Sequence, residues 1–315
     1  MSGAAPLHVV AGVIRDARGR VLLAQRAPGK HLAGLWEFPG GKSDAGEAAV
    51  DALARELHEE LGLVVESARP LIRVPHAYPQ QAIVLDVWQV SAWSGQPVAR
   101  EGQRLAWVEA DALMRLPMPA ADRPVIDALR LPWRCLVTPA VAPAAEAELL
   151  AGIERACRRG IGMVRLRQPD WPLPALAAMA RRALATCRDH DTLLLLDGDA
   201  RLTAILGLDG AHLAASALAA LPTSFASSGH WLGVDCHDAQ QLAAAVAAGA
   251  RFATLSPVFA AAASGVGGAL GWERCEELIA AVPIPVYVAG GLEGDDLDAA
   301  QMVGAQGIAA SRGLW

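Results

Sequence analysis

The hydrophobic and polar positions of residues 1–130 follow two different periods. Five short runs rich in β-branched residues predict strands: His8–Ile14, Arg20–Gln25, Leu71–Pro75, Gln81–Val90 and Leu105–Val108. The first two flank a turn at residues 16–19, which predicts a hairpin. Between them and the third run, Ala48–Leu61 has apolar residues at helical spacing, and Gly62 then ends the helix. The apolar residues that define its core face are Val50, Leu53, Ala54, Leu57 and Leu61.

Three carboxylates lie on one stripe of this predicted helix. Glu56, Glu59 and Glu60 stand at positions i, i+3 and i+4, one turn apart, and the one nearby cation is Arg55. Clustered carboxylates repel each other, whereas Mg²⁺ binds them together with substrate phosphates. The spacing alone leaves two interpretations open: a metal–polyphosphate site or a solvated acidic helix face.

From Cys135 onward, short apolar strands alternate with alanine-rich helical stretches, which predicts a (βα)8 TIM-type barrel. The eight predicted strands are Cys135–Thr138, Met163–Arg167, Leu193–Leu196, Ala211–Leu213, Trp231–Val234, Phe252–Ser256, Val286–Ala289 and Gly307–Ala310. We therefore expect an α/β chain with one domain at residues 1–130, a linker at 131–134 and a barrel at 135–315.

Composition narrows the class of protein. A chain of 315 residues that is 53% hydrophobic is long enough for two cores, and it contains no apolar run that would span a bilayer. The formal charge of −6 argues against a nucleic-acid surface, and no basic region precedes the first apolar run, so we expect no signal peptide. The five cysteines are scattered without a C-x-x-C pair, which favours a reduced cytoplasm and no zinc site.

The spacing around the acidic helix resembles a known motif. Gly41, five residues, Glu47, seven residues, Arg55-Glu56-Leu57, one residue, Glu59-Glu60, one residue and Gly62-Leu63 resemble the Nudix box. This resemblance implies an N-terminal α/β/α sandwich that cleaves a nucleoside diphosphate linked to another group, with Mg²⁺ or Mn²⁺ as cofactor.

The preceding segment narrows the resemblance to the MutT branch of the Nudix hydrolases. The residues that carry it are Gln25-Arg26-Ala27, His31 and Leu35–Gly41. The branch implies hydrolysis of 8-oxo-dGTP to 8-oxo-dGMP and pyrophosphate, which cleanses the nucleotide pool and supports DNA repair and replication. Arg26 would contact substrate and His31 would lie near it. The alternatives are a surface charge at a strand end for Arg26 and a solvated loop residue for His31.

The resemblance also implies roles for the remaining site residues. The metal ligands would be Glu56, Glu59, Glu60, Glu101 and Gly40, with Glu56, Glu59, Glu101 and Arg55 in the catalytic set. Glu101 would be a further ligand or the general base, Arg55 would orient a box carboxylate, and Glu47 would support the loop or the metal shell. The substrate-binding residues would be Arg26, His31, Phe38, Gly40, Gly41 and Asp122. Which glutamate is the base stays open.

Asp122 departs from the MutT pattern, which has an asparagine that reads the oxidised base at this position. An ionised aspartate accepts hydrogen bonds but cannot donate them. It could still accept from the N7–H of 8-oxoguanine. The alternative is that Asp122 only caps the helix predicted to start there.

The second half resembles thiamine-phosphate synthase and TenI-like proteins. The carrying residues are Val164–Gln168, Gly207–Leu213, Leu232–His237, Ala248–Ala250, Ser256–Phe259 and Ala289–Leu292. Two metal-binding aspartates of the synthases fall on Gly198 and Ala217, and the pyrophosphate loop becomes Ala260–Gly267. We therefore expect a barrel that is non-catalytic or binds a ligand, with Gly290-Gly291 as either a phosphate turn or a tight structural turn. The alternatives are a Nudix enzyme for a thiamine-pathway pyrophosphate and a bifunctional protein with synthase activity.

Overall fold

The structure is a computed structural model that describes residues 5–27, 29, 32–225, 227–259 and 268–315. The chain divides into two compact units. Unit 1 comprises Met1–Arg130 with Ala280–Pro283, and unit 2 comprises Leu131–Ile279 with Ile284–Trp315. Within the described residues, no helix combines the length and the apolar character needed to cross a membrane.

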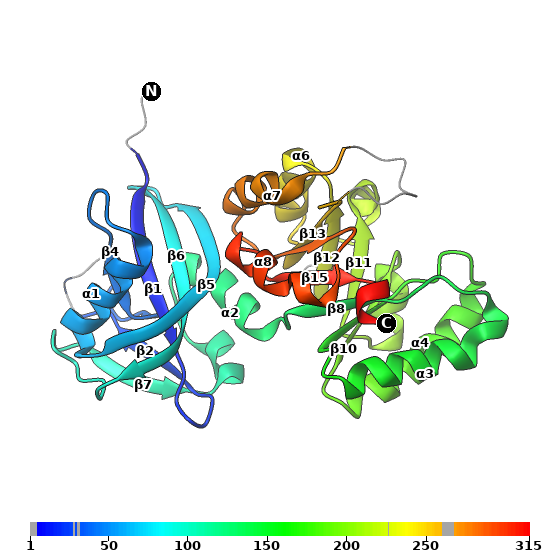
Figure 1. Cartoon of the computed structure of the whole chain (residues 1–315), viewed down its shortest axis with the longest axis horizontal. Helices are drawn as coiled ribbons and strands as arrows, with labels where there is room; N and C mark the ends of the chain where they lie inside the picture. The colour runs from blue at the N-terminus through cyan, green and yellow to red at the C-terminus, as the bar shows by residue number, and fades with distance from the viewer. Residues whose placement is uncertain (1–4, 28, 30–31, 226, 260–267) are drawn as a thin grey trace. The chain divides into compact units, whose positions relative to one another are not determined.

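Unit 1 is built on two sheets (Figure 1). A four-stranded sheet has the order β4-β1-β6-β5, and a three-stranded sheet has the order β3-β2-β7. The strands are β1 (Leu7–Ile14), β2 (Val21–Gln25), β3 (Trp36–Glu37), β4 (Gly40–Lys42), β5 (Val64–Ala77), β6 (Ala82–Ser94) and β7 (Arg104–Val108). β1 pairs in parallel with β6 and antiparallel with β4, so the strand that leads into the acidic helix lies at the sheet edge.

The predicted hairpin of the first two strands is wrong. The turn at Asp16 forms, and the N–H of Gly19 donates to the Asp16 carbonyl. However, β1 and β2 belong to different sheets and share one isolated bridge, Arg15 to Val21. Both edges of β1 are already paired, with β4 and with β6, so β2 pairs instead with β3 and β7 in the second sheet.

Helix α1 (Ala49–Leu61) covers one face of the four-stranded sheet and ends at Gly62 in the left-handed conformation, as predicted. Leu53, Leu57 and Leu61 pack with Val10 and Ile14 of β1. The prediction that Val50 belongs to the core face is wrong, because Val50 is 38% exposed and Ala52 is buried instead. The helix begins after Glu47, which therefore lies in the preceding loop rather than in the first turn.

The opposite face of the sheet is covered by α2 (Arg123–Arg130) with the 3₁₀ helices η1 (Ala110–Arg115) and η2 (Ala120–Asp122). Val125 and Ile126 of α2 are fully buried in a second core with residues such as Val13 and Val87. Two cores on the two faces of one sheet make an α/β/α sandwich, which confirms the fold expected for this part of the chain.

Unit 2 is a closed barrel of eight parallel strands in the order β10-β11-β12-β13-β14-β15-β8-β9. The strands are β8 (Arg134–Val137), β9 (Met163–Leu166), β10 (Leu193–Asp197), β11 (Gly210–Ala214), β12 (Trp231–Cys236), β13 (Phe252–Leu255), β14 (Val286–Ala289) and β15 (Gly307–Ala310). Each of them coincides within one or two residues with a predicted strand, so the barrel is confirmed. The α-helices between them are α3 (Glu146–Arg158), α4 (Leu173–Arg188), α5 (Ala200–Leu206), α6 (Ala239–Ala247), α7 (Gly271–Ala280) and α8 (Leu297–Met302).

The barrel core contains large side chains from several strands. Phe252 and Tyr287 lie edge to face at its centre, with ring centroids 5.6 Å apart. Leu131, which the sequence assigns to a linker, is buried in the same cluster. Its carbonyl accepts a hydrogen bond of 2.9 Å from the Gln306 side chain, so the structure groups this segment with unit 2.

Candidate active site

The edge strand β4 brings the loop before α1 close to β1. Gly40 pairs with Ala11, and a Cβ at Gly40 would lie 2.1 Å from the Val10 carbonyl oxygen. A Cβ at Gly41 would lie 2.2 Å from a carboxylate oxygen of Glu56. Both glycines are therefore required by close approach, and Gly41 makes room for the Glu56 carboxylate against the backbone.

Arg55 holds the carboxylates of the box together. Its guanidinium donates to Glu47 twice, at 3.0 and 2.9 Å, and to Glu56 at 2.8 Å. A third carboxylate, Glu59, lies 3.5 Å away, and the Lys42 carbonyl accepts from the same guanidinium at 3.0 Å. Arg55 thus links the loop, β4 and two turns of α1, which is the orienting role that the sequence suggested.

Glu47 ties the loop to this arginine. Hydrogen bonds from Arg55 and from the backbone N–H of Asp44 lower the pKa of Glu47 to about 2. The carboxylate therefore stays ionised at any working pH. Because both of its oxygens are engaged by Arg55, Glu47 fastens the loop to helix α1.

The loop that carries Glu101 is attached to the C-terminal end of α1. The Arg100 side chain donates to the His58 carbonyl at 2.9 Å, and its backbone N–H donates to the Glu60 carbonyl at 3.0 Å. The side chain of Gln103 reaches the same Glu60 carbonyl at 3.2 Å. These contacts use the free carbonyls of the helix end and place the exposed Glu101 beside the helix that carries the box.

A cavity of about 570 Å³ adjoins the box. Its lining includes six of the residues named from the sequence: Arg26, Phe38, Gly40, Gly41, Glu60 and Asp122. Four other predicted site residues do not line the cavity: Glu56, Glu59, Arg55 and Glu101. Of these, Arg55 forms ion pairs with Glu56 and Glu59. The predicted site residue His31 lies outside the described residues.

Sequence reasoning missed part of this cavity. Glu37 of β3, Tyr78 from the β5–β6 connection, and Ile83 and Leu85 of β6 also line it. Glu37 lies within the segment that resembles MutT, so that motif could have identified it. Tyr78 lies in the short connection between β5 and β6, and the two β6 residues follow an ordinary strand pattern, which carries no signal of a binding site.

Arg26 forms an ion pair with Glu37 at the cavity wall. The two side chains are about one-quarter exposed, at 25% and 27%. The backbone of Arg26 is fixed as well, because its N–H donates to the Leu35 carbonyl at 2.9 Å. Arg26 therefore lies in the cavity lining with a fixed partner.

Asp122 is almost completely buried, at 6% exposure, where η2 meets the cavity. Its Oδ1 atom accepts a long hydrogen bond of 3.5 Å from the backbone N–H of Phe38. Burial raises the pKa of Asp122 to about 7, and the nearby Glu37 carboxylate adds to the rise. The side chain thus accepts a hydrogen bond from a residue 84 positions earlier in the chain, and not from the first turn of α2. This contact does not support the alternative that Asp122 only caps the helix.

The donors present suit a hard divalent cation. Glu56, Glu59 and Glu60 offer carboxylate oxygens from adjacent turns of α1, and Gly40 lines the same cavity as Glu60. Glu56 is held against the Gly41 backbone, so its carboxylate is pre-positioned. Oxygen donors without sulfur or imidazole match Mg²⁺ and Mn²⁺.

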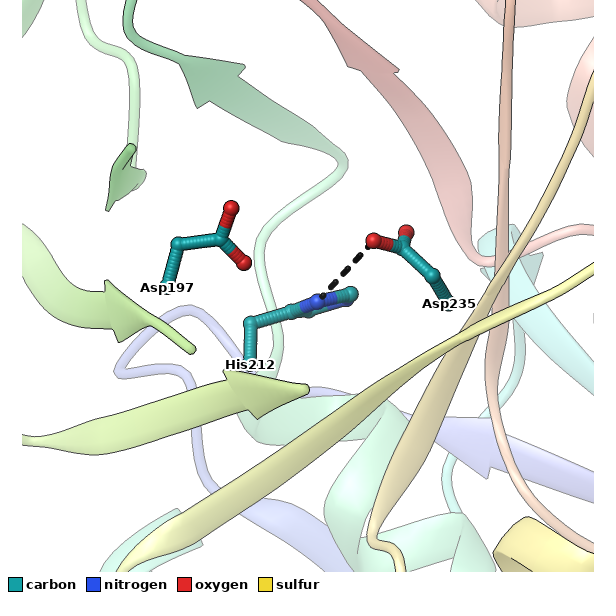
Figure 2. A group of neighbouring side chains, drawn as sticks. All are labelled: Asp197, His212 and Asp235. Carbon is teal, nitrogen blue, oxygen red and sulfur yellow. Dashed lines mark ion pairs between the residues drawn. The ribbon is translucent and has the colours of Figure 1, made fainter. Parts of the chain in front are cut away.

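A second acidic group lies at the C-terminal ends of the barrel strands (Figure 2). Asp197, His212 and Asp235 place their ligand atoms within 4.8 Å of one another. Arg165 of β9, however, donates to Asp197 at 2.8 and 3.1 Å and to Asp235 at 3.0 and 2.5 Å. Arg167 pairs with Asp197 at 3.2 Å as well. The two aspartates are therefore neutralised by two arginines, and a metal ion would have to displace Arg165.

His212 is an uncharged member of this group. Burial lowers the pKa of His212 to about 3, and the positive charge of Arg165 acts in the same direction. Its Nε2 atom is 2.9 Å from the Thr254 hydroxyl, while the buried Nδ1 atom has no hydrogen-bond partner and lies 3.7 Å from Asp235. His212 is consequently a packed, neutral residue of the barrel interior.

The Gly290-Gly291 turn follows β14 with both residues at positive φ, 94° and 73°. A Cβ at Gly290 would lie 2.8 Å from Pro257, and one at Gly291 would lie 2.9 Å from Phe259. Close packing against the neighbouring loop therefore explains both glycines, and phosphate binding at this turn stays a prediction. The segment 260–267, which takes the place of the pyrophosphate loop of the synthases, lies outside the described residues.

Comparison with known families agrees with this division. A model of the NUDIX domain matches residues 10–128, and a model of thiamine monophosphate synthase matches residues 135–314. The chain belongs to both families. Unit 1 is thus a Nudix hydrolase domain, and the barrel is a domain of the thiamine monophosphate synthase family.

Individual relatives cover one part of the chain each. An 8-oxo-dGTP diphosphatase of Haemophilus influenzae is 42% identical over 123 residues, which are 39% of this chain and 90% of that protein. A CTP pyrophosphohydrolase of Escherichia coli is 37% identical over 123 residues, again 39% of this chain and 90% of that protein. A putative thiamine-phosphate synthase of Geobacter sulfurreducens is 32% identical over 164 residues, which are 51% of this chain and 77% of that protein.

Proposed function

We propose that the Nudix domain hydrolyses a nucleoside triphosphate to the monophosphate and pyrophosphate, with 8-oxo-dGTP as its preferred substrate. The observation that carries the proposal is the cavity of about 570 Å³, which is lined both by the box and by Asp122. Glu60, Gly40 and Gly41 provide the phosphate chemistry, while Phe38 and Ile83 provide apolar surface for a base. The likeness to the Haemophilus influenzae diphosphatase supports the choice of base.

The box glutamates would hold Mg²⁺, or Mn²⁺, together with the Gly40 carbonyl and Glu101. When bound there, the ion would neutralise phosphate charge and lower the pKa of its bound water. Arg55 keeps Glu56 and Glu59 in place before the substrate arrives, so little reorganisation is needed. A carboxylate oxygen of Glu56, Glu59 or Glu101 would take the proton of the attacking water.

Arg26 would contribute a positive charge at the cavity wall. Its pairing with Glu37 holds the guanidinium at the cavity wall, where a substrate oxygen would meet its positive charge. A nucleotide bound in this cavity would thus meet an arginine on one side and the box on the other. The proposed reaction consumes one water and releases pyrophosphate.

Steady-state kinetics test the substrate. We expect kcat/KM for the full chain to be highest for 8-oxo-dGTP among 8-oxo-dGTP, dGTP, CTP and thiamine pyrophosphate at one Mg²⁺ concentration. Chromatography of the products should give 8-oxo-dGMP and pyrophosphate in equal amounts. A higher kcat/KM for CTP, or for thiamine pyrophosphate, would show that the base specificity is wrong.

For the barrel we propose a ligand-binding role without thiamine-phosphate synthesis. Gly198 and Ala217 replace the aspartates expected of a synthase, and Arg165 neutralises the two aspartates that the barrel does place at its mouth. Calorimetry of the full chain with thiamine phosphate should give measurable heat. Formation of thiamine phosphate from its two precursors would instead establish a bifunctional enzyme.

A further inference from the structure

The loop between β6 and β7 is fastened to the C-terminal end of helix α1. The Val98 N–H donates to the Leu61 carbonyl at 3.0 Å, and the Arg100 N–H donates to the Glu60 carbonyl at 3.0 Å. The Arg100 guanidinium donates to the His58 carbonyl at 2.9 Å. The last four carbonyls of a helix lack partners in the regular helical pattern, and this loop contacts three of the last four in α1. These contacts fix where the loop lies relative to the helix.

Gly62, the last glycine of the box, makes room for the Arg100 side chain. A Cβ at Gly62 would lie 2.6 Å from the Nη2 atom and 2.9 Å from the Cζ atom of Arg100. The same glycine ends α1 in the left-handed conformation, with a φ of 72°. One residue therefore both ends the helix and admits the guanidinium that binds the helix end, so Arg100 packs directly on the box.

Gln103 connects the backbones of Glu101 and Glu60 through one side-chain amide. Its Oε1 atom accepts from the Glu101 N–H at 2.9 Å, and its Nε2 atom donates to the Glu60 carbonyl at 3.2 Å. An amide offers an acceptor and a donor side by side, whereas a carboxylate only accepts and an aliphatic side chain does neither. Glu101 is thus tied to the residue of the box that lines the cavity.

We propose that Gln103 and Arg100 are positioning residues that hold Glu101 at the end of the box helix, where its carboxylate acts on the metal ion or on the attacking water. Neither side chain lines the cavity, so both act through Glu101 and not by contact with the substrate. A carboxylate on a loose loop would have to be ordered for each turnover, whereas a fastened one is already in place. This inference rests on the proposed function of the Nudix domain and names the residues that make Glu101 part of its active site.

Kinetics of loop variants test the proposal. Gln103→Leu removes both contacts of the amide at nearly constant size, so kcat for 8-oxo-dGTP should fall by about 10-fold. KM should stay within about twofold, because the cavity that holds the substrate is intact. The matched control is Gln96→Leu, the same chemical change at an exposed position of the same loop, which should keep the wild-type kcat. Arg100→Met should also lower kcat, and Arg100→Lys should recover part of the loss because lysine can still donate to the His58 carbonyl.

A double-mutant cycle with Glu101→Gln separates positioning from a purely structural role. Because Gln103 acts through Glu101, Gln103→Leu should lower kcat by less than about twofold in the Glu101→Gln background. If the amide only stabilised α1, the two losses would multiply.

Hydrogen exchange of the full chain, followed by NMR, provides a readout that depends on neither activity nor metal. The Gln103 Oε1 atom protects the Glu101 N–H. Exchange at this N–H should therefore accelerate by about 10-fold or more in Gln103→Leu and stay unchanged in Gln96→Leu.

The possible outcomes separate the inference from the proposed function. Wild-type kcat in Gln103→Leu, losses that multiply in the cycle, or unchanged exchange at Glu101 would each overturn the inference even if 8-oxo-dGTP is the best substrate. If CTP proves the best substrate, the cycle is measured with CTP. A coupled loss and faster exchange would then mean that the proposed base is wrong and the positioning role stands.

Discussion

Both units gather carboxylates around an arginine, yet the two clusters differ in charge. In the Nudix box, the ion pairs of the described residues join three carboxylates, Glu47, Glu56 and Glu59, to one guanidinium, that of Arg55. In the barrel, Asp197 and Asp235 accompany Arg165 and Arg167, and the charges balance (Figure 2). An acidic cluster requires an added cation only where the protein has not already supplied one.

The two arginines also differ in exposure. The Arg55 side chain is 29% exposed and its partner Glu59 is 61% exposed, so water and a metal ion can reach the box. The Arg165 side chain is 7% exposed and engages both aspartates at once. Asp122 shows a third way to offset the charge of a carboxylate, because a buried carboxyl group can bind a proton instead of a cation. Charge balance and access together distinguish the cluster that we propose to be catalytic from the cluster in the barrel.

The largest effect is expected from Glu56→Gln in the box. Removing one metal-binding charge should lower Mg²⁺-dependent kcat/KM by about 100-fold or more. The matched control is Asp51→Asn, which removes an exposed carboxylate from the first turn of the same helix. Steady-state hydrolysis of 8-oxo-dGTP measures both variants. Wild-type turnover in Glu56→Gln would remove this residue from the metal site.

Arg165→Met would break the charge balance of the barrel. With one guanidinium gone, two largely buried aspartates lose their main partner, which should lower the free energy of unfolding of unit 2 by about 3 kcal/mol. Calorimetry should also detect one more Mn²⁺ site in the variant than in the wild-type chain. Arg274→Met removes an exposed pair with Glu277 and should cost no more than about 1 kcal/mol. Equal effects of the two changes would contradict the contrast between the clusters.

Asp122→Asn should change how the stability of unit 1 depends on pH. The pKa of Asp122 is about 7 in the folded state and near its usual value of 3.8 in the unfolded chain, so the unfolded state binds fewer protons between these values. Wild-type stability should therefore fall as pH rises through this window, by about 2 kcal/mol more than in the variant between pH 5 and pH 8. Urea unfolding at several pH values measures the difference, and parallel curves would show that Asp122 is ionised throughout.

Arg55→Lys tests whether the box needs the geometry of its cation or only the charge. Lysine cannot bond Glu47 through two nitrogens while it also reaches Glu56, so kcat should fall by roughly 10-fold and the Mg²⁺ requirement should rise. Titration of activity with Mg²⁺ separates the two changes. A variant with unchanged kcat and Mg²⁺ dependence would mean that charge alone suffices.

Much of the architecture followed from local patterns. The eight barrel strands and helix α1 appeared where apolar periodicity placed them, because each pattern reports which face of an element is buried. The pairing of β1 and β2 was wrong, because adjacency in sequence does not reveal that β4 and β6 occupy both edges of β1. Val50 fitted the helical period yet is exposed, whereas Ala52 is buried, because the period alone does not fix which edge of the apolar stripe faces the sheet.

By itself, the sequence determined that Glu56, Glu59 and Glu60 share one stripe, because their spacing and the helical repeat are local properties. Only the tertiary structure decided what those charges meet. Glu47 reaches Arg55 from a preceding loop, Asp197 and Asp235 meet Arg165 from three strands, and Asp122 meets Phe38 across 84 residues. Charge, burial and protonation depend on neighbours distant in sequence, and those neighbours are set by folding.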